Sequence, residues 1–429
     1  MENYPNSYYF NSINRPLAKH ETLKGDYNCD VCVIGGGFSG LSTALEAARL
    51  GLSVILIEQN KIAWGASGRN GGQIWPDTSW GIEKIENQYG HNLARKIWDI
   101  SLDGVNLIDE RIKEFDINCD KKLGGILAAT SSRKLKEFEE EKEYFSKKYD
   151  FKETEILNKN DVENEIGSKR YYGGFLIKNA GHIHPLKYAL GLADAASSLN
   201  VQIFESSPAT KINKGKYSIE VISNNGKITT KNLAVCCNAY IKGLNLGIES
   251  KIMPVDTYIV GTKPLSSNLL GTILPKDYCV SDTNFDLNYY RLSKEKNMLF
   301  GGGVSYSLKN VEGLKSRTKK QLVKVFPQLL DTSIEFLWGG LIAISLNRVP
   351  NIGQLSDNIF YAQGFSGHGV AFSGIAGKII ANSIHSGKTS ELESFERIKH
   401  KNFPGGRLLR MPFLVTISAM QRMMDVFNA

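Results

Sequence analysis

Three glycines and one acidic residue have the types and the spacing of a nucleotide-binding set. Gly35, Gly37 and Gly40 form the pattern G-x-G-x-x-G, and Glu58 follows at about the 20-residue spacing of a ribose-binding acid. In such a pattern the first glycine permits a tight turn, the second lets a pyrophosphate approach, and the third lets helix and strand pack closely. These residues predict a dinucleotide site, to which we add their neighbours Phe38, Ser39 and Gln59.

The elements around these residues are the ones that such a site needs. Residues 31–34 form a short β-branched apolar run, which is typical of a strand buried on both faces. Apolar residues recur at helical spacing between 41 and 48, and residues 54–57 form a second buried strand that Glu58 closes. This order is that of a dinucleotide-binding βαβ unit, and a βαβ turn without a ligand is the alternative.

Two further glycine-rich stretches are candidates for the same ligand. The first cannot form an ordinary helix or strand, so we expect ligand contacts from Ala66, Ser67, Gly68, Arg69, Asn70, Gly71, Gly72 and Gln73. The second lies between an apolar strand at 359–363 and a helix that extends to residue 384. It contains Gly364, Phe365, Ser366, Gly367, His368, Gly369 and Val370.

The last stretch helps to distinguish between the two common dinucleotides. A nicotinamide dinucleotide needs only the first βαβ pattern. A helix N-terminus directed at a flavin would stabilise the negative charge that the ring gains on reduction, which gives the late stretch a physical reason. The sequence therefore predicts FAD, with Asn238, at the end of a buried strand, as a further contact.

The composition excludes several classes of protein. A chain of 429 residues is too long for one compact core, and 42% hydrophobic with 22% charged residues is ordinary for a globular protein. The net charge of +8 is spread without basic runs, so we expect no nucleic-acid binding. No apolar run reaches membrane-spanning length, so we expect no transmembrane segment and a cytoplasmic protein.

The cysteines are expected to be free thiols in a reducing compartment. Cys29 and Cys32 have C-x-x-C spacing, but Cys32 lies inside the first predicted strand and no second C-x-x-C follows. We therefore predict no metal site.

Hydrophobic periodicity predicts a discontinuous organisation. Helix and strand patterns alternate in most of the chain, whereas residues 252–307 have the pattern of strands of mixed polarity. We predict an N-terminal arm at 1–27, an FAD-binding domain of 28–82, 168–248 and 346–429, and a substrate domain of 83–167 and 249–345. An amphipathic helix is expected at 404–427, packed against its own body.

The glycine-rich stretches also carry a resemblance to a known family. The pattern at 35–40 with Glu58, Ala-Ser-Gly-Arg-Asn-Gly-Gly at 66–72 and Gly-Phe-Ser-Gly-His-Gly at 364–369 resemble the D-amino-acid oxidase, glycine oxidase and sarcosine oxidase superfamily. Further stretches, including 288–292, 326–328 and 403–413, resemble its gamma-glutamylputrescine oxidoreductase branch. The resemblance implies an α/β fold, with a Rossmann-like FAD-binding domain of the glutathione-reductase type and an inserted α+β substrate domain on an antiparallel sheet.

The resemblance also implies a reaction. A hydride would pass from the α-carbon of an amine to flavin N5, giving an imine that water hydrolyses to an aldehyde, with O2 reduced to H2O2. The substrate would be gamma-glutamylputrescine or a related amine or amino acid. An amine dehydrogenase with another electron acceptor, and a flavoprotein that modifies a partner protein, are the alternatives.

Two departures from the family bear on these expectations. Some sarcosine-type relatives attach FAD through a cysteine on the strand that corresponds to 338–345, where this chain has none, so we predict non-covalent FAD. The same relatives carry an oxygen-activating lysine on the strand that corresponds to 298–303, which here reads Met-Leu-Phe-Gly-Gly-Gly. The acceptor is therefore open between O2 and another carrier.

Residues outside the glycine-rich stretches complete the predicted site. Arg291 is predicted to bind a substrate carboxylate, because a guanidinium matches carboxylate geometry, and a surface salt bridge is the alternative. Tyr290 and Trp75 are predicted walls of the amine pocket, and His368 is predicted to lie over the flavin edge. Ile212 resembles the family's backbone contact to adenine.

Overall fold

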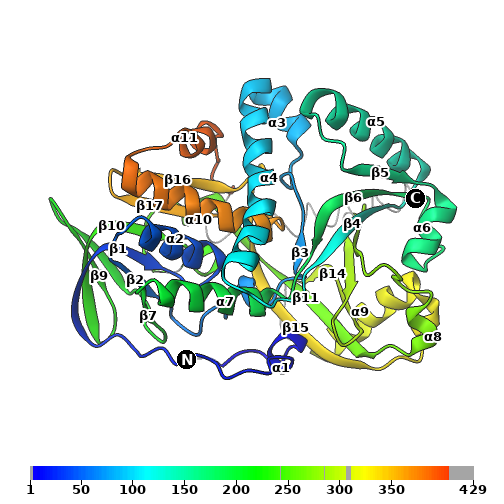
Figure 1. Ribbon diagram of the computed structural model, residues 1–429, viewed down its shortest axis with the longest axis horizontal. Coiled ribbons are helices and arrows are strands. Elements are labelled where there is room, and N and C mark those ends of the chain that lie inside the picture. Colours follow the sequence, from blue (N-terminus) through cyan, green and yellow to red (C-terminus); the bar gives the residue numbers. More distant parts are fainter. Residues whose placement is uncertain (1–2, 242, 285, 306–310, 405–429) are drawn as a thin grey trace.

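The computed structural model describes residues 3–241, 243–284, 286–305 and 311–404. Two sheets, each with its own helices, lie side by side and are joined in the middle by a long helix (Figure 1). The amphipathic helix expected at 404–427 lies outside the described residues, apart from its first position.

The first sheet has a parallel centre in the order β17–β10–β1–β2–β7. β16 extends it antiparallel to β17, and the β8–β9 hairpin extends it antiparallel to β10. The last four residues of β1 are all buried, as a strand covered on both faces requires. The strands are Gly25–Ile34 (β1), Val54–Ile57 (β2), Gln202–Phe204 (β7), Lys211–Lys214 (β8), Ile219–Ile222 (β9), Gly226–Val235 (β10), Asn351–Ser356 (β16) and Ile359–Gln363 (β17).

Three helices pack together beside this sheet, with α2 contacting both α7 and α10 (Figure 1). They are Phe38–Arg49 (α2), Pro185–Ser198 (α7) and Gly369–Ser386 (α10). The long helix His91–Glu114 (α4) follows Ile82–Tyr89 (α3) and packs on α10, where a Cβ on Gly104 would lie 3.0 Å from the carbonyl oxygen of Ala371. A last short helix, Ser390–Arg397 (α11), contacts α4 and β16.

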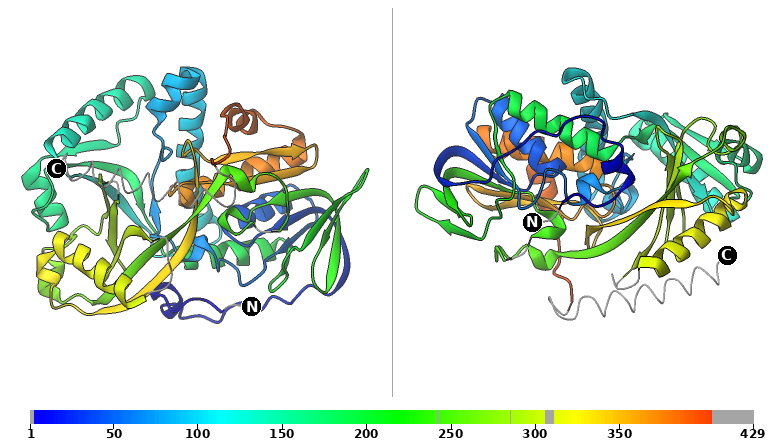
Figure 2. Two further views of the ribbon diagram at one scale, coloured as in Figure 1. Left: turned by 180° about the vertical axis from the view of Figure 1, so that it is seen from behind. Right: turned by 90° about the horizontal axis from the view of Figure 1, so that it is seen from below.

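The second sheet is mostly antiparallel, in the order β15–β11–β14–β13–β12–β4–β6–β3, with β5 beside β6. β4 and β12 are its parallel pair. Its strands are Gln73–Ile74 (β3), Lys122–Ala129 (β4), Thr154–Leu157 (β5), Gly173–His182 (β6), Ile252–Pro264 (β11), Cys279–Asp282 (β12), Asn288–Leu292 (β13), Asn297–Ser305 (β14) and Ile334–Ser345 (β15). The helices on this side are Ser132–Tyr149 (α5), Lys159–Ile166 (α6), Ser267–Leu270 (α8) and Val311–Val325 (α9), as Figure 2 shows from two further sides. The predicted fold class is confirmed.

Two features of the chain path differ from the predicted segment boundaries. β3 and β6 belong to the second sheet, although their residues fall in segments predicted for the FAD-binding domain. β1 begins at Gly25, inside the predicted arm, because the strand extends before its apolar core through polar residues that still pair with β10. The remaining arm runs along the first sheet to the short helix Tyr8–Asn11 (α1), which lies near β15 (Figure 1).

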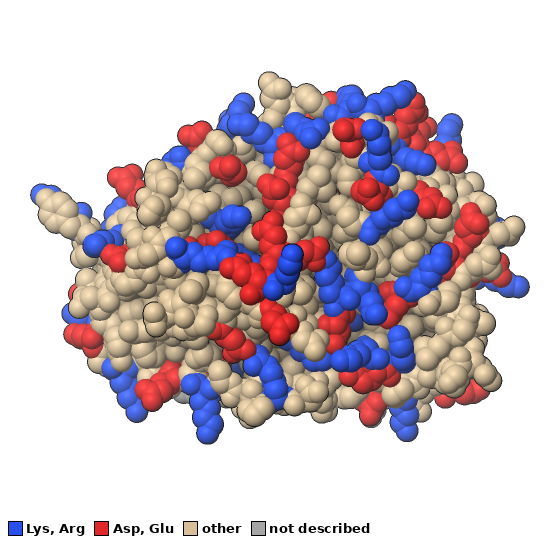
Figure 3. Space-filling model, viewed as in Figure 1, with Lys and Arg blue, Asp and Glu red and all other residues tan. Residues whose placement is uncertain are grey.

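On the face shown in Figure 3, Lys and Arg are interspersed with Asp and Glu. Within the described ranges, no helix combines the length and the apolar character of a membrane span.

Candidate active site

A pocket opens where β1 ends and α2 begins. Gly35 has a φ of +112°, and a Cβ there would lie 2.7 Å from the carbonyl oxygen of Cys236. A Cβ on Gly40 would lie 1.8 Å from the carbonyl oxygen of Gly35, and one on Gly37 would lie 2.9 Å from Oγ of Ser67. The surroundings therefore require all three glycines, and they leave bare backbone at a helix N-terminus, which suits a pyrophosphate.

Glu58 follows directly after β2 and lines the same end of the pocket. Its Oε2 accepts a hydrogen bond from the backbone N–H of Gly36 at 2.8 Å, and its Oε1 accepts one from Asn60 at 2.9 Å. Burial raises the pKa of the carboxyl above its usual value, although these backbone donors oppose the shift. The carboxylate is thus held in place where it can accept hydrogen bonds from a ribose.

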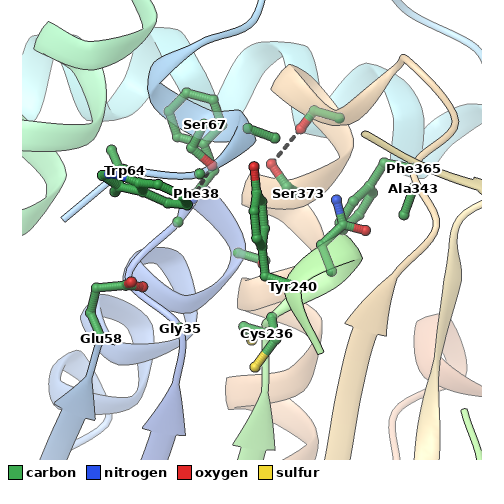
Figure 4. A pocket seen from close by; sticks show the side chains of 18 of the residues that line it. Gly35, Phe38, Glu58, Trp64, Ser67, Cys236, Tyr240, Ala343, Phe365 and Ser373 are labelled. Carbon is green, nitrogen blue, oxygen red and sulfur yellow. Dashed lines mark hydrogen bonds between the residues drawn. The ribbon is translucent and has the colours of Figure 1, made fainter. Parts of the chain in front are cut away.

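The pocket extends from this end toward the second sheet. Figure 4 shows Gly35 and Glu58 on one side, Ala343 and Phe365 on the other, and Tyr240 between them. The predicted residues that line the pocket are Gly35, Gly37, Phe38, Ser39, Glu58, Gln59, Ala66, Ser67, Asn70, Asn238, Phe365, Ser366, Gly367, Gly369 and Val370.

Other lining residues were missed by sequence reasoning because no pattern marks them. Tyr240, in the turn Asn238–Tyr240 (η2), accepts a hydrogen bond from the N–H of Leu341 at 3.3 Å, and its ring covers Gly65. Trp64 packs edge to face against Tyr240. The rest of the missed set comes from strand ends, from the segment after β7 and from α10, and includes Ser207, Ala209, Cys236, Cys237, Ile342, Ala343 and Ser373. An apolar strand preceding the site was the only available signal for Cys236 and Cys237.

The third glycine-rich stretch forms the turn between β17 and α10. The N–H of Gly364 donates to Oδ1 of Asn238 at 2.9 Å, so this turn is fastened to the end of β10. His368 is the N-cap residue of α10. His368 and Gly364 are not in the pocket lining, although the neighbours of His368, Gly367 and Gly369, are. Burial, together with the nearby Arg348, lowers the pKa of His368 to about 4, so its imidazole is neutral at neutral pH.

The loop at 66–73 contributes only part of its length to the lining. Arg69 stacks on the ring of Trp64 at 4.1 Å and donates from Nε to the Trp64 carbonyl and from Nη1 to the Gly339 carbonyl. It therefore faces β15 rather than the pocket. The predicted residues Gly68, Gly71, Gly72 and Gln73 are also outside the lining, as is Gly40, whose role is to let α2 approach β1.

Arg291, which was predicted to bind a substrate carboxylate, is held by backbone contacts in the structure. It is 4% exposed and lies outside the pocket lining. Its guanidinium donates to the carbonyl oxygens of Gly71, Leu292 and Ile183 at 2.7, 3.1 and 2.9 Å, and to the hydroxyl of Tyr9 at 3.2 Å. These acceptors occupy the fork that a carboxylate would need.

Three further predicted site residues lie outside the pocket lining. Tyr290 points to the opposite side of β13 from Arg291, where its hydroxyl donates to Tyr171 at 3.0 Å and its ring stacks on Phe300. The ring of Trp75 packs against Gly125, away from the pocket. Ile212 lies in the β8–β9 hairpin, and the preceding residues Ser207 and Ala209 line the pocket instead, because the chain passes the pocket before it enters the hairpin.

Comparison with known proteins decides the family. Residues 30–383 match the family DAO, described as FAD dependent oxidoreductase. The chain belongs to the DAO family. Within that family it is 38% identical over 426 residues to gamma-glutamylputrescine oxidoreductase of Escherichia coli strain K12, and the match covers 99% of each protein.

Solved structures show the DAO-family fold independently. Glycine oxidase from Geobacillus kaustophilus gives a TM-score of 0.74 at 17% identity, covering 88% of this chain and 100% of that one. L-Proline dehydrogenase from P. horikoshii gives 0.71 at 21% identity, covering 87% and 98%.

The pocket residues fit the FAD of the DAO family. The Cβ-free backbone at Gly35 and Gly37 would hold the pyrophosphate, Glu58 the ribose, and the loops at 66–73 and 364–370 the flavin end. When bound, FAD supplies the hydride acceptor for oxidation of an amine or amino acid. The chain is thus an FAD-dependent oxidoreductase.

The cofactor is bound non-covalently. β15 carries no cysteine, and burial raises the pKa of the lining thiols Cys236 and Cys237, which disfavours the nucleophilic thiolate. All six cysteines lie in the described ranges and are free. Among the residues that the structure describes, no group of three or more His, Cys, Asp or Glu is arranged to hold a metal ion.

Proposed function

We propose that this enzyme oxidises a primary or secondary amine at the carbon next to the nitrogen, with gamma-glutamylputrescine or a close relative as its substrate. The net reaction takes a two-electron acceptor and water, breaks one C–H bond, and yields an aldehyde, an amine or ammonia, and the reduced acceptor. The observation that carries the proposal is the 38% identity over nearly the full length of the Escherichia coli gamma-glutamylputrescine oxidoreductase.

The chain's own residues support this chemistry through shape and charge. Trp64, Tyr240 and Phe365 give the pocket apolar walls that exclude water. The N-terminus of α10 brings partial positive charge toward the flavin end. His368 adds no full charge at neutral pH, since its pKa is about 4. The proposal takes the amine to bind unprotonated, so that its oxidation needs no acid–base pair.

The test is anaerobic mixing of the yellow holoenzyme with gamma-glutamylputrescine while the flavin absorbance is followed. Rapid bleaching is the expected result, and putrescine is the matched comparison that lacks the glutamyl group. A faster reaction with gamma-glutamylputrescine would show that the glutamyl part is recognised. Failure of both amines, and of a panel of simpler amines and amino acids, would contradict the proposal and would favour a flavoprotein that modifies a partner protein.

A second candidate is an amine dehydrogenase that passes its electrons to a carrier other than O2. It is favoured by the sequence of β14, which carries no lysine from Asn297 to Ser305. The same experiment decides between the two, because air should restore the colour of an oxidase within its turnover time. Slow recovery in air, with rapid recovery on adding a quinone, would identify the dehydrogenase.

A further inference from the structure

The loop at 66–73 is held from outside the first sheet through its backbone carbonyls. The carbonyl of Arg69 accepts a hydrogen bond from Nε1 of Trp338, on β15, at 2.9 Å. The carbonyl of Gly71 accepts one from Nε of Arg291, on β13, at 2.7 Å. The carbonyl of Gly72 accepts one from the N–H of Ile183, just after β6, at 2.9 Å. Three separate segments thus fix three carbonyls of one short loop.

Arg291 is the most connected of these anchors. Its fork joins the loop carbonyl of Gly71 to the carbonyl of Ile183, so one side chain sets the distance between two segments. A buried guanidinium is costly unless its donors are satisfied, and the four acceptors found here satisfy four of its five N–H donors without a carboxylate. The charge and the planar geometry of the Arg291 guanidinium therefore serve to bind backbone carbonyl groups.

The N-terminal arm completes this arrangement. Tyr9, on α1, is fully buried, and its hydroxyl accepts from Nη2 of Arg291 at 3.2 Å. Its ring packs edge to face on Trp338 at 5.2 Å and on His184 at 5.0 Å. The arm thereby touches two of the anchors that hold the loop.

A shift of the loop would reach the cofactor pocket directly. Ser67 and Asn70 both line the pocket. Oγ of Ser67 accepts from the N–H of Phe38, the first residue of α2, at 2.9 Å, and Oδ1 of Asn70 accepts from the N–H of Gly72 at 2.7 Å. The position of the loop is therefore coupled to both ends of the pocket.

We propose that Arg291 is a positioning residue for the FAD site, and that it acts together with Tyr9 of the N-terminal arm. The pair fixes the carbonyl of Gly71, and with it the loop at 66–73, in the position that FAD requires. The inference rests on FAD binding and is independent of which amine the enzyme oxidises.

The test measures FAD affinity of the apoprotein by fluorescence titration, without any substrate. Arg291→Lys keeps the charge but loses the planar fork, and we expect FAD to bind about tenfold more weakly, as the loss of one charge-assisted hydrogen bond predicts. Tyr9→Phe and Trp338→Phe keep their rings and should weaken FAD by about threefold to tenfold, in line with the loss of a neutral hydrogen bond.

The matched control is Tyr171→Phe. This change also removes a buried tyrosine hydroxyl that has a hydrogen-bonding partner, but it does so on the other side of β13. FAD affinity should stay within about twofold of wild type. If Arg291→Lys fails to fold, Tyr9→Phe takes its place in the titration. This smaller change leaves the guanidinium of Arg291 and its three carbonyl contacts in place.

A second measurement separates positioning from substrate binding. For a positioning residue, Arg291→Lys should alter the visible circular dichroism of the flavin before any amine is added, and should affect amines with and without a carboxylate by the same factor. Unchanged FAD affinity and an unchanged flavin spectrum, with a raised KM only for carboxylate-bearing amines, would overturn the proposal and restore Arg291 as a substrate clamp.

Discussion

The two ends of the cofactor pocket are built in different ways. At the pyrophosphate end, Gly35, Gly37 and Gly40 belong to one continuous segment from the end of β1 into α2, and backbone carbonyl oxygens leave no room for a side chain at Gly35 and Gly40. At the other end, the loop at 66–73 is held by Arg291, Trp338 and Ile183, which come from distant parts of the chain. The first end depends on local backbone conformation, whereas the second depends on correct assembly of the two sheets. Substitutions at one end should therefore affect that end more than the other, to which it is joined by the hydrogen bond from Phe38 to Ser67.

The largest loss of FAD affinity is expected from adding a side chain at the pyrophosphate end of the pocket. Gly40→Ala would place a Cβ 1.8 Å from the carbonyl oxygen of Gly35, a contact that α2 can relieve only by moving away from β1. We expect a colourless protein that binds neither FAD nor ADP in equilibrium titrations. Gly271→Ala, at a position with φ of −69° and no atom closer than 3.8 Å, is the control and should stay yellow. A yellow Gly40→Ala protein would contradict the steric argument.

The next largest effect, at Gly72, should distinguish the flavin end of the pocket from the pyrophosphate end. Gly72 has a φ of +73°, and a Cβ there would lie 2.1 Å from the carbonyl oxygen of Ile183. Gly72→Ala should displace the loop and weaken FAD by about a hundredfold, the ~2–3 kcal/mol expected from overpacking. ADP binding should fall by less, because the loop reaches the pyrophosphate end through the hydrogen bond between Ser67 and Phe38. Equal losses of FAD and ADP would show that the two ends are not independent.

A smaller effect is expected at Glu58. Glu58→Gln removes the charge that accepts ribose hydroxyl groups, so FAD and ADP should both bind about tenfold more weakly. Glu163→Gln, a change on the exposed side of α6, is the control. If Glu58→Gln weakened FAD but not ADP, the carboxylate would have to act at the flavin end, contrary to its place beside Gly36.

The smallest effect is expected in the pH dependence of stability, and it should involve neither end of the cofactor pocket. Burial raises the pKa of Asp77, before α3, to about 6, and burial with the nearby Asp77 raises that of Glu141, on α5, to about 7. Both folded values exceed the unfolded ones near ~4, so the folded state holds more protons between about pH 4 and 7, and stability falls as pH rises through this range. Tm should decrease from pH 5 to 8, and Glu141→Gln should flatten the decrease. A Tm that rises over this range would contradict these pKa shifts.

The same contrast explains what the sequence could predict. The strands at 54–57 and 359–363 have the predicted bounds, and the helix after residue 368 has nearly the predicted end, because each has a strong apolar pattern of its own. The glycine-rich turns lie at the pocket because their residue types are required by backbone geometry at that place. FAD was predictable for the same reason.

The remaining parts depend on pairing between distant segments. Tyr290 and Arg291 are adjacent in sequence, yet they lie on opposite sides of β13, and no local pattern indicates which side faces the cofactor domain. The partners of Arg291 are backbone carbonyls, which every residue has, so the sequence around Arg291 cannot reveal them. Tyr240 lines the pocket from a short turn that has no periodicity to reveal it.

The contact between Tyr9 and Arg291 also has a consequence for biosynthesis. The two residues are separated by 282 positions, and β17 and α10, which form part of the pocket, follow later still. During translation, the aromatic arm is therefore made long before its partner exists, and the loop at 66–73 lacks two of its three anchors until β13 and β15 have left the ribosome. Stable loading of FAD should accordingly be a late event, which follows synthesis of most of the chain.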